Sequence, residues 1–300
     1  MTIGEWLATA TQKLQAVGIE TARLDALVLL EDAASVDRTR LLAHPEEELS
    51  SDTQNVLSAW LVRRVQHEPL AYIRGKSEFY GREFAVSPAV LVPRPETETM
   101  IDLLKTWINR HSEFVSEPRT LKSGERKILN QVQDDASGGR VTIMDVGTGS
   151  GALAITAASE VSGAEVWGLD IDPECLQIAQ ENTKMHDVKI TLAESDLLEL
   201  QGGEVFPDPT VLLCNLPYVP DEYAINDAAR HEPALALFAG ADGLDLYRKL
   251  FEQSVILRTK PLLILTESLE TQHLALRQLA KSYGYEEESR EGLIQAFVLA

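Results

Sequence analysis

The sequence predicts an α/β protein whose main sheet is parallel and covered by helices on both faces, preceded by a small all-α bundle and a β-hairpin linker. Three observations support this. The chain of 300 residues is longer than a common single domain. Its first seventy residues have the periodicity of helices only, and from Val141 onward short apolar strands alternate with helices.

Residues 1–70 are predicted to form the helical bundle. Thr2 and Glu5 stand in capping-box spacing at its start, and apolar residues then recur at steps of three or four. Gly18 is a plausible end of the first helix, and Pro69 stops the last one. Together these helices form the first predicted domain.

Residues 71–92 change to short β-like pieces and are predicted to form a hairpin linker with its turn at Tyr80 and Gly81. The main domain is predicted over residues 93–300 and begins with an amphipathic helix after Pro95. Periodicity disappears at about residues 112–140, which we interpret as a surface insertion.

Strands and helices alternate through the rest of the chain. Helices are expected after Gly151, from Asp172 and Pro173, at about residues 244–255, and after the strand expected at 262–266. Such alternation is typical of a parallel sheet with helices on both faces. The expected strands are 141–146, 165–170, 188–192, 211–214, 262–266 and 296–299.

Composition limits the classes of partner. The formal net charge of −20 disfavours a phosphate backbone as the main ligand, so we expect no direct nucleic-acid binding. No leader-like or membrane-spanning segment is apparent, which indicates a cytoplasmic protein without membrane contact, expected to be a monomer. The two cysteines and six histidines show no ligand spacing, so no metal is predicted.

A glycine-rich loop lies between the first strand of the main domain and the next helix. It consists of Gly147, Thr148, Gly149, Ser150 and Gly151, preceded by Asp145 and Val146. Glycines there allow a tight turn and close approach of a ligand to the backbone, and the helix N-terminus offers unpaired N–H groups. A glycine turn without a ligand is the alternative interpretation.

Asp170 ends the next strand, about twenty residues beyond this loop, where a carboxylate can accept hydrogen bonds from both ribose hydroxyls of an adenosine. Asp172 competes for this role but precedes Pro173, so it is better interpreted as a helix N-cap. Asp196, followed by Leu197, is interpreted either as the adenine-side wall, with Leu197 packing on the base, or as a loop carboxylate or cap. The dinucleotide fingerprint needs its third glycine one residue later, so the loop and Asp170 favour S-adenosylmethionine.

The tetrapeptide Asn215, Leu216, Pro217 and Tyr218 directly follows the apolar strand 211–214, at the strand end where open α/β sheets carry chemistry. An amide nitrogen is a poor nucleophile because its lone pair is delocalised. The Asn215 side-chain oxygen and the Leu216 backbone carbonyl are placed to accept its two N–H groups and orient it. Tyr218 is a candidate for stacking on the planar substrate group.

With these motifs the chain resembles the HemK/PrmC family of protein-(glutamine N5) methyltransferases. The resemblance covers nearly the whole chain and rests on six motifs: Ala22–Ala26 (ARLDA), Glu68–Ile73 (EPLAYI), Leu91–Glu98 (LVPRPETE), Asn215–Tyr218 (NLPY), His231–Leu235 (HEPAL) and Ala239–Leu244 (AGADGL).

The resemblance implies a seven-stranded Rossmann-like class I methyltransferase domain joined by a β-hairpin to the helical bundle, which would bind a release factor. It implies that S-adenosylmethionine contacts Gly147–Gly151, Asp170, Leu197 and Asn215 and leaves as S-adenosylhomocysteine. Asn215–Tyr218 would hold the substrate, the glutamine of the GGQ motif of peptide chain release factors, so that the enzyme supports translation termination. Leu91–Glu98 would lie near the same pocket in a supporting role.

Three departures from the family pattern are the insertion at 112–140, Leu216 where a proline is usual, and Glu267-Ser268 where a glycine is expected. Leucine keeps the backbone carbonyl needed at position 216. Two alternatives stay open: an adenine-N6 nucleic-acid methyltransferase, against which the charge and the absence of an evident basic groove count, and a catalytically silent relative that binds a translation factor.

Overall fold

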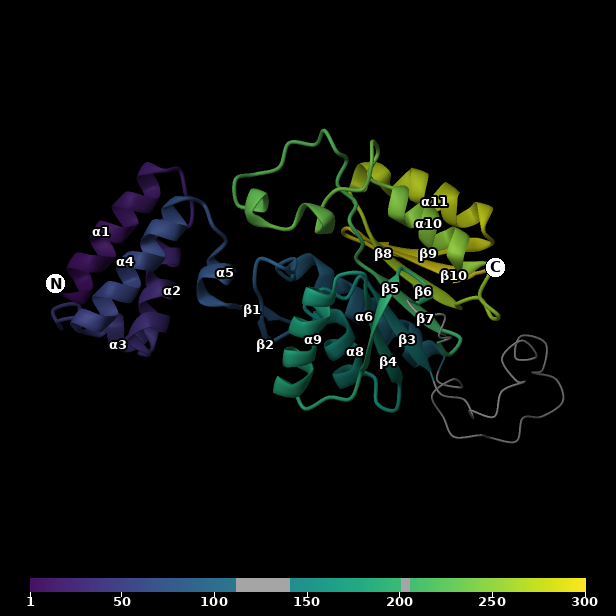
Figure 1. Cartoon of the computed structure of the whole chain (residues 1–300), viewed down its shortest axis with the longest axis horizontal. Helices are drawn as coiled ribbons and strands as arrows, with labels where there is room; N and C mark the ends of the chain where they lie inside the picture. The colour runs from purple at the N-terminus through teal and green to yellow at the C-terminus, as the bar shows by residue number, and fades with distance from the viewer. Residues whose placement is uncertain (112–140, 201–205) are drawn as a thin grey trace. The chain divides into compact units, whose positions relative to one another are not determined.

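The computed structural model describes residues 1–111, 141–200 and 206–300 (Figure 1). The predicted insertion at 112–140 lies outside the described residues. Two compact units are present: Met1–Ser77 with Ile225–Glu232, and Glu78–Ala224 with Pro233–Ala300. The segment Ile225–Glu232 therefore belongs with the helical unit, although it lies within the range predicted for the main domain.

The first unit is helical, as expected. Its helices are α1 (Ile3–Ala16), α2 (Ala22–Ala34), α3 (Arg38–Ala43), α4 (Ser51–Val65) and α5 (Leu70–Arg74), with the short 3-10 turn Ala229–His231. The predicted capping box is confirmed, because Glu5 N donates to Thr2 Oγ1 (3.2 Å) and Thr2 N donates to Glu5 Oε2 (2.9 Å). Gly18 follows α1 with φ of 82°, a left-handed conformation that glycine adopts without steric cost.

A buried ion pair joins two helices of this unit. Arg64 Nε of α4 donates to Asp25 Oδ2 of α2 at 2.7 Å, and Asp25 is only 4% exposed. Around it the helices share one apolar core, which includes Leu14, Leu30 and Leu57. Because a buried carboxylate is stable only when it is paired, the ARLDA motif has a structural role in this protein.

The predicted hairpin consists of β1 (Lys76–Phe79) and β2 (Arg82–Ala85). Its turn residues Tyr80 (φ 52°) and Gly81 (φ 69°) both have positive φ, which matches the twist of a two-residue hairpin. Helix α5 precedes the hairpin, where the sequence pattern indicated β-like structure. It forms because Pro69 sets a fixed φ at its start and Gly75 ends it in the left-handed region.

One sheet dominates the second unit, with strand order β6-β5-β4-β3-β7-β8-β10-β9. The six strands expected from the sequence pattern are present, although the third lies at Thr191–Asp196 and not at 188–192. Strand β9 completes the seven that the family resemblance implies, and β6 adds a two-residue edge strand. The strands are β3 (Thr142–Val146), β4 (Glu165–Asp170), β5 (Thr191–Asp196), β6 (Glu199–Leu200), β7 (Val211–Cys214), β8 (Leu263–Glu267), β9 (Tyr285–Glu291) and β10 (Ile294–Leu299).

The sheet is parallel from β5 to β8, as expected, but β10 runs antiparallel to both β8 and β9, so the parallel arrangement does not extend to this end. Strand β9 was also not expected from the sequence, because Tyr285–Glu291 is rich in glutamate. Its edge position explains that composition, since an edge strand exposes side chains and charges there discourage further pairing.

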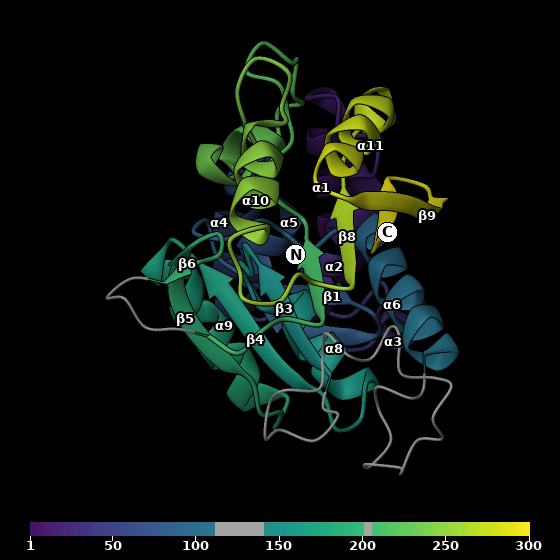
Figure 2. The same cartoon turned by 90° about the vertical axis from the view of Figure 1, so that its right-hand side faces the viewer.

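Helices cover both faces of the sheet, as Figure 2 shows. Alternate residues of β3 enter different cores. Ile143 packs with α6 (Glu98–Arg110) and α8 (Ala152–Glu160), whereas Met144 and Val146 pack with α10 (Asp245–Ser254) and α11 (His273–Ser282). The other helical segments among the described residues of this unit are α9 (Pro173–Met185) and the 3-10 turns Pro95–Thr97, Ala234–Ala236 and Glu270–Gln272.

Candidate active site

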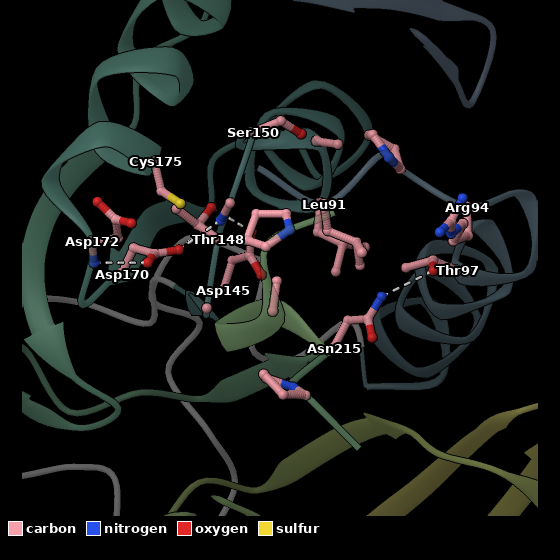
Figure 3. Close-up of a pocket in the computed structure, with 18 of the residues that line it drawn as sticks. Leu91, Arg94, Thr97, Asp145, Thr148, Ser150, Asp170, Asp172, Cys175 and Asn215 are labelled. Carbon is pink, nitrogen blue, oxygen red and sulfur yellow. Dashed lines mark hydrogen bonds between the residues drawn. The ribbon is translucent and has the colours of Figure 1, made fainter. Parts of the chain in front are cut away.

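The second unit contains a pocket at the carboxyl ends of β3, β4 and β7 (Figure 3), with about 840 Å³ of empty space, open solvent included. This is the place where open α/β sheets bind ligands. Figure 3 shows Asp170 and Asp172 at one end of the pocket and Asn215 with Thr97 at the other. The sequence-predicted loop, carboxylate and tetrapeptide therefore contribute to one site.

The glycine loop is held against the neighbouring strand by its backbone. Gly147 N and Thr148 N both donate to the carbonyl of Leu169 at 2.8 Å. Gly149 has φ of 53° and open space where a side chain would be, and it lines the pocket. Gly151 also has positive φ, but it faces away from the pocket toward α9, where a side chain would lie 3.1 Å from Ala179. The loop thus provides a backbone surface that a ligand can approach closely.

Asp170 ends β4 and lines the pocket while only 8% exposed. Its Oδ2 accepts from Gly149 N (2.8 Å) and its Oδ1 from Asp172 N (3.0 Å). Each carboxylate oxygen can accept more than one hydrogen bond, so both oxygens of Asp170 can still accept from the ribose hydroxyls of a bound adenosine. Burial raises the pKa of Asp170, although these backbone N–H groups lower it. Asp172 caps α9 by accepting from Glu174 N at 2.8 Å, which confirms the N-cap interpretation.

Asp145, the last residue but one before the glycine loop, is a third carboxylate on the pocket. Its Oδ2 accepts from Thr148 Oγ1 (2.6 Å) and Ala154 N (3.0 Å), while Oδ1 is buried without a hydrogen-bond partner among the described residues. Burial raises its pKa to about 7. A buried, unpartnered carboxylate oxygen favours a positively charged ligand group beside it.

These observations test the fit to S-adenosylmethionine. The pocket wall carries Asp145, Asp170 and Asp172, a set of carboxylates that suits the ammonium and sulfonium charges of that cofactor. The same set opposes the pyrophosphate of a dinucleotide, which needs free N–H groups or cations. The donor and acceptor chemistry of the pocket therefore fits S-adenosylmethionine.

The tetrapeptide begins where β7 ends. Asn215 lines the pocket and its Nδ2 donates to Thr97 Oγ1 at 3.1 Å. Pro217 also lines the pocket, whereas the Leu216 side chain is buried beneath the glycine loop, within 3.2 Å of a side chain built on Gly147. A leucine is accommodated here because it packs into the core between the loop and the sheet.

Tyr218 does not lie on the pocket wall. Its hydroxyl donates to Glu267 Oε1 (3.0 Å), and its carbonyl accepts from Gln272 Nε2 (2.7 Å), which also donates to the Asp242 carbonyl at 2.7 Å. A side chain on Gly243 would lie 2.1 Å from the Tyr218 carbonyl, so the AGADGL motif requires glycine there. This packing supports the tetrapeptide from behind.

The segment 91–98 contributes more than its predicted supporting role, because Leu91, Pro93, Arg94 and Thr97 all line the pocket. Thr97 is buried and contacts Asn215 directly, which the sequence did not indicate. Leu197, predicted to contact the adenine, is not a lining residue and belongs to the core beside α10. Asp196 pairs with Lys249 instead of reaching the pocket.

Within residues 1–111, 141–200 and 206–300, no group of three or more His, Cys, Asp or Glu side chains is arranged to hold a metal ion. In the same part of the chain, no helix combines the length and apolarity needed to cross a membrane.

Comparisons with known proteins agree with this geometry. The family model of the PrmC N-terminal domain matches residues 5–75, and that of ribosomal protein L11 methyltransferase matches residues 127–216. The chain is 35% identical over 257 residues to the release factor glutamine methyltransferase of Koribacter versatilis, covering 84% of this chain and 81% of that one. It is 34% identical over 289 residues to the enzyme of the same name from Moorella thermoacetica, covering 95% and 91%.

The chain belongs to the release factor glutamine methyltransferase family. It is a methyltransferase that depends on S-adenosylmethionine, as the glycine loop and the acidic pocket wall predicted. The HemK/PrmC resemblance and the fold class are likewise confirmed. A bifunctional methyltransferase of Rickettsia bellii is 32% identical over 259 residues, and the chain spans 46% of that longer protein.

Proposed function

We propose that this methyltransferase methylates the side-chain amide nitrogen (N5) of a glutamine in a peptide chain release factor and acts in the cytoplasm, where translation terminates. The names of the Koribacter and Moorella relatives support the substrate class. The observation that carries the proposal is the position of Asn215, a side-chain amide on the same pocket as Asp145 and Asp170. An amide group there is suited to recognise another amide.

The first task of the site is to orient a poor nucleophile. Asn215 Nδ2 is directed at Thr97, so Oδ1 is the atom left to accept an N–H of the substrate glutamine. The Leu216 carbonyl, held by the buried Leu216 side chain, is proposed as the second acceptor. With both hydrogens held, rotation of the substrate amide is restricted and its nitrogen faces the reacting carbon.

S-adenosylmethionine, when bound, supplies a methyl group carried on a sulfonium. Transfer of that methyl group to the substrate nitrogen would leave S-adenosylhomocysteine as the product and would place positive charge on the nitrogen. Asn215 and Leu216 oxygens stabilise that charge through the N–H groups they accept. The methylated nitrogen is strongly acidic and releases a proton to water, so no side chain is required as a base.

The helical unit is proposed to recognise the release factor. Its described surface carries no constellation of catalytic groups, and its segment Ile225–Glu232 follows the tetrapeptide in the chain after only six residues. Within this unit His231 Nε2 lies 2.9 Å from the Gln66 carbonyl at the end of α4. The chain that leaves the catalytic loop is therefore anchored in the unit proposed to bind substrate.

The decisive experiment incubates the protein with a release factor and methyl-labelled S-adenosylmethionine, followed by peptide mass spectrometry. We expect one added methyl group on one glutamine. The same assay with an adenine-containing oligonucleotide provides the comparison with a nucleic-acid methyltransferase. Methylation of the oligonucleotide alone would replace the proposal, and cofactor binding without any transfer would indicate a silent relative.

Asn215→Ala tests the chemical assignment. Removing the amide should lower turnover by roughly a hundredfold to a thousandfold, the usual effect of losing a preorganised partner of the transition state. Affinity for S-adenosylmethionine, measured by calorimetry, should change little, because Asn215 acts on the nucleophile. Asn215→Asp is the matched companion, since it keeps an acceptor of the same size. Near-normal turnover of Asn215→Ala on a release factor would make the tetrapeptide only a turn.

A further inference from the structure

Three elements bring a chain of polar side chains together behind Asn215. Thr97 precedes α6, Asn215 follows β7 and Glu267 ends β8. Asn215 Nδ2 donates to Thr97 Oγ1 at 3.1 Å, and Thr97 Oγ1 donates to Glu267 Oε2 at 2.6 Å. Thr97 is 3% exposed and Glu267 only 1%. Figure 3 shows the bond between Asn215 and Thr97 at the edge of the pocket.

The direction of the hydrogens in this chain follows from chemistry. An ionised carboxylate has no proton and can only accept, so the Thr97 hydroxyl must donate its single hydrogen to Glu267. The Thr97 oxygen is then left to accept, and the Asn215 group that can donate to it is the NH₂. Asn215 Oδ1 must consequently point away from Thr97.

This orientation matters because the two ends of an asparagine amide have similar shape and opposite polarity. If the amide turned over, its NH₂ would face a substrate N–H group, and the Leu216 carbonyl would be the one proposed acceptor left. The flip exchanges two atoms of nearly equal size, so packing alone discriminates weakly between the two orientations. A directional hydrogen bond is therefore needed to select one of them.

We propose that Glu267, acting through Thr97, is the positioning residue that fixes the amide orientation of Asn215. The role rests on the proposed function, in which Asn215 Oδ1 accepts an N–H of the substrate. Glu267 does not touch the substrate in this proposal and transmits polarity through one hydroxyl. This role accounts for the presence of a buried carboxylate behind the neutral side chain of Asn215.

Glu267 is itself held in place. Its Oε1 accepts from the Tyr218 hydroxyl at 3.0 Å, and its backbone carbonyl accepts from Tyr247, whose hydroxyl also lies 3.0 Å from the Cys214 carbonyl. These bonds occupy the second carboxylate oxygen and attach the end of β8 to the end of β7. The carboxylate therefore presents Oε2 to Thr97 with little freedom to turn.

The orientation of the Asn215 amide depends on the charge of Glu267. A protonated Glu267 can donate to Thr97, and the Thr97 hydroxyl can then donate to Asn215 Oδ1, which reverses the amide. Burial raises the pKa of Glu267, and the nearby Glu96 raises it further, while Thr97, Tyr218 and Arg94 lower it. Turnover should therefore fall as pH decreases, with an acid limb above the usual range of a glutamate.

The test compares Glu267→Gln, Thr97→Val and Thr97→Ser with the wild type on an intact release factor. Glutamine keeps the size of Glu267 but can donate to Thr97, so kcat should fall by roughly tenfold to a hundredfold while KM and cofactor affinity stay within a few-fold. Thr97→Val should cause a similar loss, and Thr97→Ser, which keeps the hydroxyl, should restore most of it. The double variant Thr97→Val with Glu267→Gln should be no slower than the slower single variant, because both substitutions interrupt the same series of hydrogen bonds.

The pH profile separates positioning from simple support of the fold. With S-adenosylmethionine at saturation, the part of the acid limb of kcat that belongs to Glu267 should disappear in Glu267→Gln, because the amide at this position does not protonate, while Asp145 and Asp170 are unchanged. Wild-type turnover retained by both Glu267→Gln and Thr97→Val would overturn the positioning role while leaving the proposed function intact. The positioning role would also be overturned if the variants lost turnover only in proportion to lost cofactor affinity and melting temperature, with the acid limb of kcat unchanged. No methylation of a release factor glutamine by the wild type would instead reject the proposed function, and this role with it.

Discussion

At the scale of single residues, the pocket combines buried carboxylates with one neutral amide. Asp145, Asp170 and Asn215 all line it, the two carboxylates being proposed for the cofactor and the amide for the substrate. This separation follows from chemistry, because carboxylates suit a cationic cofactor whereas a neutral acceptor suits an amide nitrogen that becomes positive only during transfer. Two predictions concern the carboxylates.

Replacing Asp170 by alanine should weaken S-adenosylmethionine binding by roughly 1.5–3 kcal/mol, the usual effect of losing a charge-assisted acceptor. Asp170→Asn is the matched control, because it keeps one acceptor oxygen while losing the charge, and it should bind with intermediate affinity. Calorimetry on the folded variants measures both values. An affinity equal to that of the wild type would remove Asp170 from the cofactor site.

Asp145→Asn should stabilise the ligand-free protein at neutral pH. The pKa of Asp145 in the fold is about 7, raised from 3.8 by burial, so the folded state holds its proton more tightly than the unfolded state. The free energy of unfolding of the wild type therefore decreases as pH rises from about 4 to 7, by roughly 4–5 kcal/mol at about 1.4 kcal/mol per pKa unit. The variant lacks this loss, because its amide does not ionise.

Denaturant unfolding of the ligand-free wild type and Asp145→Asn at pH 4, 6 and 8 measures this difference. The advantage of the variant should be absent near pH 4 and largest at pH 8. Its affinity for S-adenosylmethionine should decrease, since the negative charge facing the cofactor is lost. A stability difference that does not change with pH would contradict the assigned ionisation.

At the scale of elements, one asparagine of α9 connects three parts of the second unit. Asn182 is fully buried; its Oδ1 accepts from Ala85 N (2.7 Å), and its Nδ2 donates to the carbonyls of Ala85 (3.0 Å) and Ser150 (2.8 Å). It therefore joins the end of hairpin strand β2 to the glycine loop. This link explains how a segment before the domain's first sheet strand supports the cofactor loop.

Asn182→Ala should lower the free energy of unfolding by about 2–4 kcal/mol, because the buried Ser150 carbonyl and two half-buried backbone groups of Ala85 lose their partner. It should also weaken cofactor binding, since the Ser150 carbonyl is no longer held beside α9. Asn182→Asp is the informative companion, because it keeps the acceptor for Ala85 N but loses both donors. Chemical denaturation and calorimetry give the two values, and an unchanged stability of Asn182→Ala would show that water replaces the side chain.

At the scale of the whole molecule, the chain divides chemistry and the proposed substrate recognition between two units. All lining residues of the pocket belong to the second unit. The helical unit has its own core and its own buried ion pair, Asp25 with Arg64. This division predicts that removing the helical unit impairs recognition of the release factor more than it impairs methyl transfer itself.

Removing residues 1–70 should lower kcat/KM far more on an intact release factor than on a short glutamine peptide. We expect at least a tenfold loss on the protein, because its contacts with the helical unit are gone, and little loss on the peptide. Circular dichroism and cofactor calorimetry on the truncated chain show whether the second unit remains folded. Equal losses on both substrates, with intact cofactor binding, would mean that the helical unit does not recognise the release factor.

The sequence by itself determined the class of fold and three of the main parts of the site. Gly147–Gly151, Asp170 and Asn215 could be placed together without coordinates, because each stands at the carboxyl end of a parallel strand and those ends meet at one edge of a sheet. The capping box at Thr2 and the hairpin turn at Tyr80 and Gly81 were equally readable, since they depend on neighbours within a few residues.

Only the tertiary structure decided which side chains support these parts. Thr97 and Glu267 are 170 residues apart and share a hydrogen bond of 2.6 Å. Asn182 and Ala85 are 97 residues apart. Such contacts depend on how α6, α9 and β8 pack, and no local pattern encodes that. The polarity of Asn215 is therefore set by the folded molecule, because a carboxylate distant in the sequence lies one hydroxyl away in space.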